Sequence, residues 1–319
     1  MKNKKNKIVI ASGKGGVGKS MLVSALATLF SKNQKVVAVD CDADAPNLVI
    51  WLGGIEKLAP HRARSGAGWD KVIPVVTSAK PEFDLDKCNG CGLCAKNCRF
   101  SALRLTLSAQ GKLPKPKLNP FLCEGCGACE VICPQKAIQL KPVQNGEIKI
   151  KKIREIGGKF VKIREMMLVS GQLYPGETGS GKVVAEIKKE ADKFDHNLMI
   201  IDSAPGTGCP VIASLQDANF SVLITEPTPS GFTDLKRVLK VVNHFKIPWG
   251  LVINKWDIDP KLSDQIKKWA RKKFLGRISY DKKIFKAIAN LTPILETNLK
   301  AKVEIKNIFK KIDKLCPDH

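Results

Sequence analysis

The chain has 319 residues, 44% of them hydrophobic, which is enough for one large domain or two moderate domains with a buried core. No segment approaches the roughly 18 uninterrupted apolar residues of a membrane-spanning helix, and the apolar run after the basic N-terminus is too short for a signal peptide, so we expect a soluble cytoplasmic protein. The net charge of +24 is compatible with a nucleic-acid or membrane partner, but the lysines are scattered along the chain, which favours an ordinary solvated surface.

A phosphate-binding loop is predicted near the N-terminus. Residues 7–12 read as a short buried strand, a helix is expected from Lys19 to about Ser31, and the residues between them match the pattern G-x-x-x-x-G-K-[ST]. Backbone N–H groups of such a loop surround phosphate oxygens, while Lys19 reaches the β- and γ-phosphates and the Ser20 hydroxyl binds Mg²⁺. The predicted nucleotide-binding residues are Gly13, Lys14, Gly15, Gly16, Val17, Gly18, Lys19, Ser20 and Met21.

Four further apolar runs end in polar or glycine-rich loops, as strands do when a binding site lies at their carboxyl ends. They are KVVAVDCDADAPN, NLMIIDSAPGTG, FSVLITEPTPSG and WGLVINKWD. Helical patterns are predicted between them at 181–194, 231–245 and 260–274. Strands that alternate with helices indicate an α/β fold, a doubly wound and mostly parallel sheet of the P-loop NTPase type.

A cysteine-rich internal repeat interrupts this alternation, and eight of the eleven cysteines lie in its two halves. We expect residues 81–141 to form an inserted domain directly after the second strand, with 1–80 and 142–319 as the ATPase domain. The segment after the insert, GEIKIKKIREIGGKFVKIREMM, is predicted to form two short strands with a Gly-Gly turn that return the chain to the main sheet.

Both halves of the repeat have the spacing C-x2-C-x2-C-x3-C, which is typical of bacterial ferredoxins. In that pattern each [4Fe–4S] cluster takes three cysteines of one run and the fourth of the other. The predicted ligand sets are Cys88, Cys91, Cys94 and Cys133 for one cluster, and Cys123, Cys126, Cys129 and Cys98 for the second. Zinc is the less favoured alternative, because it needs only four ligands in two pairs.

The remaining cysteines, Cys41, Cys209 and Cys316, are expected to be small buried hydrophobic residues. Cys209 follows PGTG directly, so a bridging ligand between two subunits is a second hypothesis for it. A further segment, GETGSGKV at 176–183, copies the spacing of the phosphate loop. We discount it as a nucleotide site because Val183 replaces the hydroxyl residue that would bind Mg²⁺.

GKGGVGKS, with its additional Lys14, resembles the deviant Walker A loop of the MinD/ParA group of P-loop ATPases (SIMIBI class). That group includes the nitrogenase iron protein and the Mrp/Nbp35-type iron–sulfur carriers. The resemblance implies a homodimer that closes over two ATP molecules, with Lys14 reaching the phosphates bound by the partner. It also implies that Lys14, Lys19 and Asp42 are catalytic, with Asp42 orienting the attacking water.

The same resemblance implies a Mg²⁺ site formed by Ser20, Asp40 and Asp202, and an adenine contact from Asn254. Asp44 is an alternative to Asp42. N-K-x-D at 254–257 is also the guanine signature of GTPases, so GTP stays open beside ATP.

The whole chain resembles MinD-superfamily ATPases that contain an inserted ferredoxin domain. We expect an ATPase whose cofactors are ATP, Mg²⁺ and two [4Fe–4S] clusters, and which couples its nucleotide state to electron transfer or to cluster delivery to a client protein. The alternative is a positioning ATPase that binds DNA or membrane. Its support is the net charge and the last segment, in which an apolar stripe is formed by Val303, Ile305, Ile308, Phe309, Ile312 and Leu315. We favour the simpler explanation that this segment is a helix packed on the sheet through that stripe.

Overall fold

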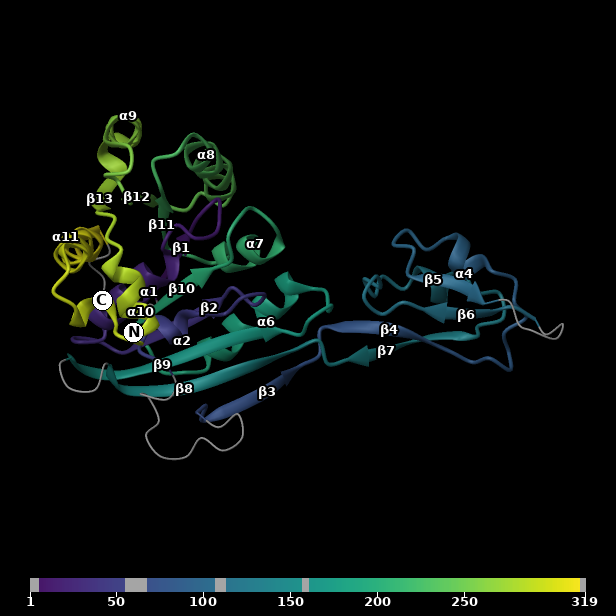
Figure 1. The fold of residues 1–319 in the computed structure, drawn as a ribbon. Coiled ribbons are helices and arrows are strands. Elements are labelled where there is room, and N and C mark those ends of the chain that lie inside the picture. The colour runs from purple at the N-terminus through teal and green to yellow at the C-terminus, as the bar shows by residue number, and fades with distance from the viewer. Residues whose placement is uncertain (1–5, 55–67, 107–112, 157–160, 316–319) are drawn as a thin grey trace.

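The computed structural model describes residues 6–54, 68–106, 113–156 and 161–315. They form a large body around one sheet and a smaller lobe at the far end of a two-stranded ribbon (Figure 1). The smaller part, residues 78–106 and 113–143, contains both cysteine runs and is called the cysteine lobe below. Among the described residues, no helix is both long and apolar enough to cross a membrane.

The large body contains a nine-stranded sheet in which seven neighbouring strands are parallel. This confirms the predicted α/β fold with a mostly parallel sheet. In order across the sheet the parallel strands are β13 (Phe274–Ile278), β12 (Trp249–Asn254), β11 (Phe220–Thr225), β1 (Asn6–Ala11), β10 (Leu198–Ser203), β2 (Val36–Cys41) and β9 (Val161–Leu173). Two antiparallel strands, β8 (Gly146–Ile156) and β3 (Lys71–Val75), complete one edge.

Helices cover both faces of the sheet and bury two apolar cores. On the central strand β1, Ile8 and Ile10 pack into one core while Val9 and Ala11 pack into the other, because successive side chains of a strand point to opposite faces. The first face carries α1 (Lys19–Phe30), α2 (Leu48–Trp51), η2 (Ile294–Glu296) and α11 (Lys300–Leu315), with α10 (Lys283–Ala289) beside η2. The second carries α6 (Ser180–Asp192), α7 (Cys209–Leu215), α8 (Pro229–His244) and α9 (Pro260–Ala270).

Two predicted elements differ in the structure. The segment after the cysteine lobe forms long strands, not short ones, since β8 has 11 residues and β9 has 13. The second half of β9 is apolar and pairs in parallel with β2, so the predicted return to the main sheet is confirmed. The predicted Gly-Gly turn lies outside the described residues. The helix predicted at 260–274 ends at Ala270, and a short turn η1 (Arg271–Lys273) leads into the edge strand β13.

The terminal helix α11 packs on the sheet, as predicted, but through a narrower stripe. Ile305, Ile308 and Ile312 are buried, whereas Val303 and Leu315 are 59% and 56% exposed. Phe309 meets Phe30 of α1 edge to face, with ring centroids 4.7 Å apart. The apolar face of α11 is therefore used by the fold.

The two halves of the cysteine lobe fold alike. Each half contains a one-turn helix, α4 (Leu93–Lys96) or α5 (Ala128–Val131), which follows a glycine with positive φ. Two antiparallel strand pairs complete the lobe, β4 (Ser78–Phe83) with β7 (Ile138–Val143) and β5 (Leu103–Thr106) with β6 (Lys115–Leu118). The β4–β7 ribbon extends slightly beyond the predicted bounds of 81 and 141 and is the part of the lobe that leads to the body (Figure 1).

The expectation that the insert follows the switch strand directly is wrong. Helix α2 and strand β3 stand between the end of β2 and the start of β4. Any link between the nucleotide site and the cysteine lobe must therefore pass through contacts in space rather than through a short connection along the chain.

Candidate functional site

The phosphate loop lies between the end of β1 and the start of α1, as the sequence predicts. Gly18 precedes α1 with φ of 91°, and a Cβ at this position would lie 2.4 Å from Nδ2 of Asn254, so only glycine fits. Lys19 begins the helix and its side chain is buried. The N–H groups of this helix end and the Lys19 charge together suit an anionic phosphate.

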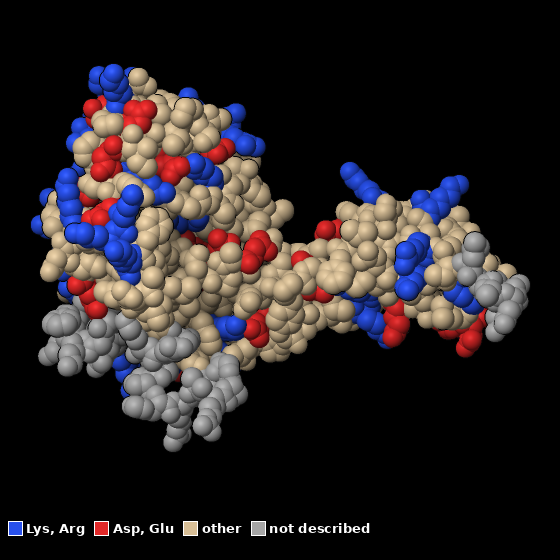
Figure 2. Space-filling view, viewed as in Figure 1, with Lys and Arg blue, Asp and Glu red and all other residues tan. Residues whose placement is uncertain are grey.

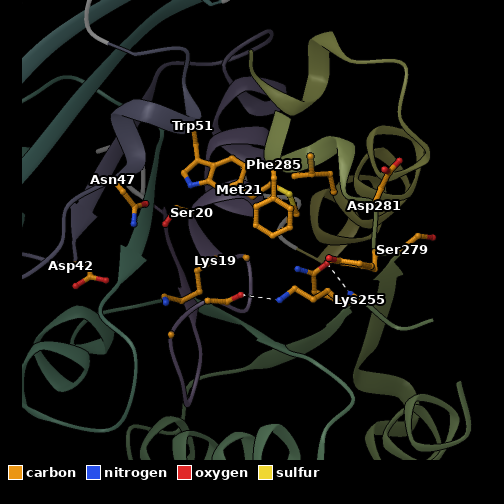
Figure 3. A pocket seen from close by; sticks show the side chains of 16 residues that line it. Lys19, Ser20, Met21, Asp42, Asn47, Trp51, Lys255, Ser279, Asp281 and Phe285 are labelled. Atoms are coloured by element: carbon orange, nitrogen blue, oxygen red, sulfur yellow. Dashed lines mark hydrogen bonds between the residues drawn. The ribbon is translucent and has the colours of Figure 1, made fainter. Parts of the chain in front are cut away.

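A cavity of about 270 Å³ opens over this loop (Figure 3). This volume is close to the lower limit of small-ligand pockets, about 300 Å³. Its lining residues include Gly15, Gly16, Gly18, Lys19, Ser20, Met21, Asp42 and Asn254 of the predicted site, and also Asn47, Trp51, Tyr280 and Phe285. No sequence pattern linked these three aromatic residues to the site, because they come from α2 and from the segment around α10, far apart along the chain.

Asp40 and Asp202 are directly paired in register on β2 and β10, and both are buried. The Asp40 carboxylate accepts hydrogen bonds from the backbone N–H groups of Asp42, Asn47 and Leu48, at 3.2, 2.9 and 2.9 Å. It therefore holds the loop that carries Asp42 and Asn47. Burial, and then the nearby Asp202 charge, raise the pKa of Asp40 well above its ordinary value.

Neither carboxylate oxygen of Asp202 has a hydrogen-bond partner among the described residues. Burial raises the pKa of Asp202 to about 6, against the opposing effects of the Lys19 charge and of the nearby Ser20 hydroxyl. A buried and unpartnered carboxylate near a phosphate loop suits a hydrated cation. The geometry therefore fits Mg²⁺ near Ser20 and Asp202, while the direct role of Asp40 is to hold a loop; its predicted role near the metal stays a prediction.

The structure separates the two candidates for water activation. Asp42 is half-buried and lines the cavity, and burial raises its pKa while Lys19 lowers it. Asp44 is exposed and does not line the cavity. The position of Asp42 suits the predicted role better.

Lys14 forms an ion pair with Glu226, which follows β11 directly. The second carboxylate oxygen of Glu226 lies 3.2 Å from Nζ of Lys255, and that ammonium also donates to the carbonyl of Gly16 at 3.2 Å. Although burial raises the pKa of Glu226, hydrogen bonds from Lys14 and Lys255 bring it below its ordinary value. Glu226 therefore holds the additional lysine within its own chain. Glu226 was expected at a strand end, but no sequence pattern linked it to Lys14.

The side chains of N-K-x-D hold loops of the pocket. Nδ2 of Asn254 donates to the Val17 carbonyl at 2.8 Å, and its Oδ1 accepts the backbone N–H of Lys255 at 2.9 Å. Oδ1 of Asp257 accepts the backbone N–H of Tyr280 at 2.7 Å. Asp257 is thus engaged with the backbone and does not line the cavity, which weakens the guanine alternative.

The cysteine lobe contains two small cavities, and the cysteines that line them match the two predicted ligand sets. Cys98, Cys123, Cys126 and Cys129 line one cavity, and Cys88, Cys91, Cys94 and Cys133 line the other. Each has a volume of about 20 Å³, on the measure that gives about 270 Å³ for the nucleotide cavity. Each cavity therefore takes its fourth cysteine from the other run.

The chemistry of these cavities fits iron–sulfur clusters. The Sγ atoms of Cys98 and Cys133 accept backbone N–H groups of Ala102 and Ala137, each at 3.3 Å, and such bonds stabilise a thiolate ligand. The remaining lining is mostly apolar, and burial raises the pKa of Cys129 to about 11, so a free thiol here stays neutral. Among the described residues, no three His, Cys, Asp or Glu side chains are grouped so that they could hold a single metal ion.

The second glycine-rich segment does not form a phosphate loop. Helix α6 begins at Ser180, two residues before Lys182, so this lysine lies inside the helix. Nδ2 of the buried Asn145 donates to the Thr178 carbonyl at 2.9 Å and fills the adjoining turn. Cys41 is buried as predicted; Cys209 is exposed at the start of α7, contrary to the prediction, and Cys316 lies outside the described residues.

Comparisons with known proteins agree with this geometry. The family model described as CobQ/CobB/MinD/ParA nucleotide binding domain matches residues 8–294. The uncharacterized protein MJ0578 of Methanocaldococcus jannaschii is 35% identical over 316 residues, which cover 96% of this chain and 96% of that protein. An iron-sulfur cluster carrier protein of the same organism is 42% identical over 74 residues, 23% of each chain. The septum site-determining protein MinD of Pyrococcus horikoshii OT3, complexed with Mg-ADP, has a TM-score of 0.57 at 14% identity over 99% of both chains, a likeness of fold alone.

Proposed function

The chain belongs to the CobQ/CobB/MinD/ParA family of nucleotide-binding domains, and from this premise we propose an ATP-hydrolysing switch that carries two [4Fe–4S] clusters in its cysteine lobe. The nucleotide state of the switch controls electron transfer through these clusters, or their delivery to a client protein. The clusters supply one-electron chemistry when they are bound, and the chain supplies their ligands and the control.

The observation that carries this proposal is the match between cavities and ligand sets. Two runs of cysteines with ferredoxin spacing line two separate cavities, and each cavity exchanges its fourth cysteine with the other. Cys98 and Cys133 are the exchanged residues, and both Sγ atoms already accept a backbone N–H group. This arrangement suits two four-iron clusters better than any set of single ions.

The nucleotide half of the proposal assigns the phosphates to the loop and Lys19, and Mg²⁺ to Ser20 and Asp202. Asp42 orients the attacking water, while Trp51 and Phe285 lie on the base side of the cavity (Figure 3). Lys14 acts on the phosphates of a second subunit, for which it must leave Glu226. The ion pair with Glu226 therefore belongs to the open, monomeric state, and ATP-dependent dimerisation exchanges it for a phosphate contact.

A chain of contacts leads from the nucleotide loop towards α6. The backbone N–H of Gly206, which follows the strand of Asp202, donates to the Ser12 carbonyl at 2.9 Å. Three residues later, Cys209 packs against the first turn of α6, where a Cβ at Gly181 would lie 2.9 Å from the Cβ of Cys209. A shift of the loop at Gly206 is therefore transmitted to the start of α6.

The loop before α6 in turn contacts the cysteine lobe. Lys80 on β4 forms an ion pair with Glu177 at 2.5 Å, and both side chains are at most 19% exposed. The ring of Phe121 lies over Gly176, where a Cβ would be 2.1 Å from Cδ1 of the ring. Phe121 is two residues before Cys123, so this loop connects the switch to one of the cluster cavities.

Anaerobic purification followed by iron, sulfide and nucleotide analysis tests the clusters. We expect close to eight iron atoms per chain, from two clusters with four irons each. A colourless and iron-free protein after anaerobic reconstitution would refute cluster binding.

The coupling is tested by the rate at which the clusters are reduced by dithionite, or transferred to an apo-ferredoxin, with ATP, with ADP and without nucleotide. We expect the rate to change with ATP, and Lys19→Ala to abolish that change. Lys268→Ala is the matched control, because this exposed lysine on α9 lies outside the cavity and outside the contacts that lead to the cysteine lobe. Equal rates in all nucleotide states would rule out coupling while leaving the clusters intact.

The alternative, a positioning ATPase on DNA or membrane, has less support from the described residues. The apolar face of α11 packs into the core, and only Val303 and Leu315 of the predicted stripe are left exposed. ATP-dependent co-sedimentation with anionic liposomes, or ATP- and salt-dependent binding to duplex DNA, would support this alternative; the proposal expects neither.

A further inference from the structure

The β5–β6 pair forms one wall of both cluster cavities. Leu103 lines the cavity of Cys98, while Leu105 and Pro116 line the cavity of Cys88. These inward positions alternate with outward ones, because successive side chains of a strand point to opposite faces. Arg104 and Lys117 therefore lie on the outer face of the strand pair, and its inner face lines the cavities.

Arg104 and Lys117 are direct partners across the two strands, and both are exposed. No described acidic side chain forms an ion pair with either of them. Like charges in directly opposite positions destabilise a strand pair by a few tenths of a kcal/mol up to about 1 kcal/mol. The fold therefore tolerates a repulsion here that a single acidic residue would remove.

The surroundings of this pair are also basic. Lys115 lies on the same strand as Lys117, and its Nζ donates hydrogen bonds to the carbonyls of Leu85 and Cys88. Basic side chains outnumber acidic ones in the described part of the lobe, and Figure 2 shows several of them standing out from its surface. No aromatic side chain lies among the residues of β5 or β6, so the face lacks the stacking platform on which single-stranded nucleic acid binds.

We propose that the outer face of β5–β6, with Arg104 and Lys117 at its centre, is the docking site of a small acidic iron–sulfur electron-transfer protein. This inference rests on the proposed presence of the clusters. In the exchange, one electron passes from the reduced partner to an oxidised cluster; the partner is oxidised, the cluster is reduced, and no bond or proton moves. The rate of electron transfer falls steeply with distance, and a partner bound to this face is separated from both cavities only by the β5–β6 pair.

Charge complementarity suits such a partner, because weak electron-transfer complexes are small and their association is steered by electrostatics. The test uses the full-length protein, reconstituted anaerobically and shown to contain clusters. The probe is a reduced plant-type [2Fe–2S] ferredoxin of strongly acidic composition. Stopped-flow kinetics give the second-order rate of electron transfer, and calorimetry gives binding directly, at low and at high salt.

We expect Arg104→Glu/Lys117→Glu to slow electron transfer by roughly 10-fold or more at low salt, to weaken binding in parallel and to remove most of the salt dependence. The control is Lys268→Glu/Lys272→Glu, which makes the same charge change on exposed positions of the large body and leaves both measurements unchanged. The single variant Lys117→Glu places opposite charges across the strand pair, so its melting temperature is not lowered, and loss of binding in this variant is not loss of fold.

Unchanged rate and binding in the Arg104→Glu/Lys117→Glu variant would overturn the proposal. So would an equal loss in the control variant. A protein that contains clusters but shows no response to ATP, and still depends on Arg104 and Lys117, would support docking while refuting the proposed coupling. Absence of iron would instead refute the proposed function.

Discussion

Replacing Asp202 by asparagine is expected to stabilise the nucleotide-free protein while abolishing its response to Mg²⁺ and ATP. Both oxygens of Asp202 are buried, and neither has a hydrogen-bond partner among the described residues. The pKa of the carboxyl rises from 3.8 to about 6 in the folded protein. This difference corresponds to about 3 kcal/mol, at 1.36 kcal/mol for each pH unit.

The pH dependence of stability follows from proton binding to Asp202. Because the folded state binds the proton more tightly than the unfolded state, the free energy of unfolding falls as the pH rises from about 4 to about 6, and the full cost is present above pH 6. Asparagine carries no charge, so the variant avoids this cost. Its amide has no better hydrogen-bond partners, which reduces the expected gain to about 1–3 kcal/mol at pH 7.5.

Urea unfolding at several pH values, with EDTA and without nucleotide, measures this gain. The difference between variant and wild type should grow between pH 4 and 6 and then remain constant. Addition of Mg²⁺ and ATP should stabilise the wild type and not the variant, since a ligand that binds only the folded state raises its stability. Asp313→Asn, at an exposed position on α11, is the control and should change stability by less than about 0.5 kcal/mol at every pH. A variant that is no more stable than wild type at pH 7.5 would refute the reasoning.

Three further predictions concern the core, a buried charge and the ligand sets. Ile308→Ala should destabilise the protein by about 2–5 kcal/mol in urea unfolding, because Ile308 is buried. Val303→Ala, on the exposed side of α11, should cost less than about 0.5 kcal/mol. Equal costs would contradict the packing of this helix. Lys188→Met should cost about 1–3 kcal/mol in the same assay, since the buried ammonium donates to the carbonyls of Ala213, Ser214 and Gln216 at the end of α7, and an unchanged stability would show that water can replace it. Cys133→Ser should impair the cluster of the first run, so iron analysis should find about half of the wild-type iron. Cys88, Cys91 and Cys94 should then become reactive to thiol reagents. New reactivity at Cys123, Cys126 and Cys129 would instead contradict the predicted ligand sets.

Local sequence patterns were sufficient for the parts of the molecule whose interactions are close along the chain. The phosphate loop needs a strand, glycines with unusual backbone angles and a helix start, and all of these lie between residues 6 and 30. The buried parallel strands were predicted from their continuous apolar runs, and their carboxyl ends placed Asp42, Asp202 and Asn254 near one another. The cysteine spacing likewise predicted two sets of four before any geometry was known.

Patterns were insufficient where an element is short or its partner is distant. Strand β13 has only five residues and was not predicted, and the helix before it was extended to Phe274 although it ends at Ala270. The return of the second half of β9 to the main sheet was predicted, but its length and its pairing with β2 were not. Exposure of Val303 and Leu315 depends on where α11 lies on the sheet, which periodicity does not specify.

The sequence by itself determined that this protein has a nucleotide loop, acidic strand ends and two ferredoxin-type cysteine runs, because each depends on residue type and spacing within one short segment. Only the tertiary structure decided that Lys14 pairs with Glu226, that Asp40 holds the Asp42 loop, and that the cysteine lobe contacts the body through Phe121 and Gly176. Those contacts join residues far apart along the chain. Their partners are selected by the packing of whole elements, and packing leaves no signature in a local pattern.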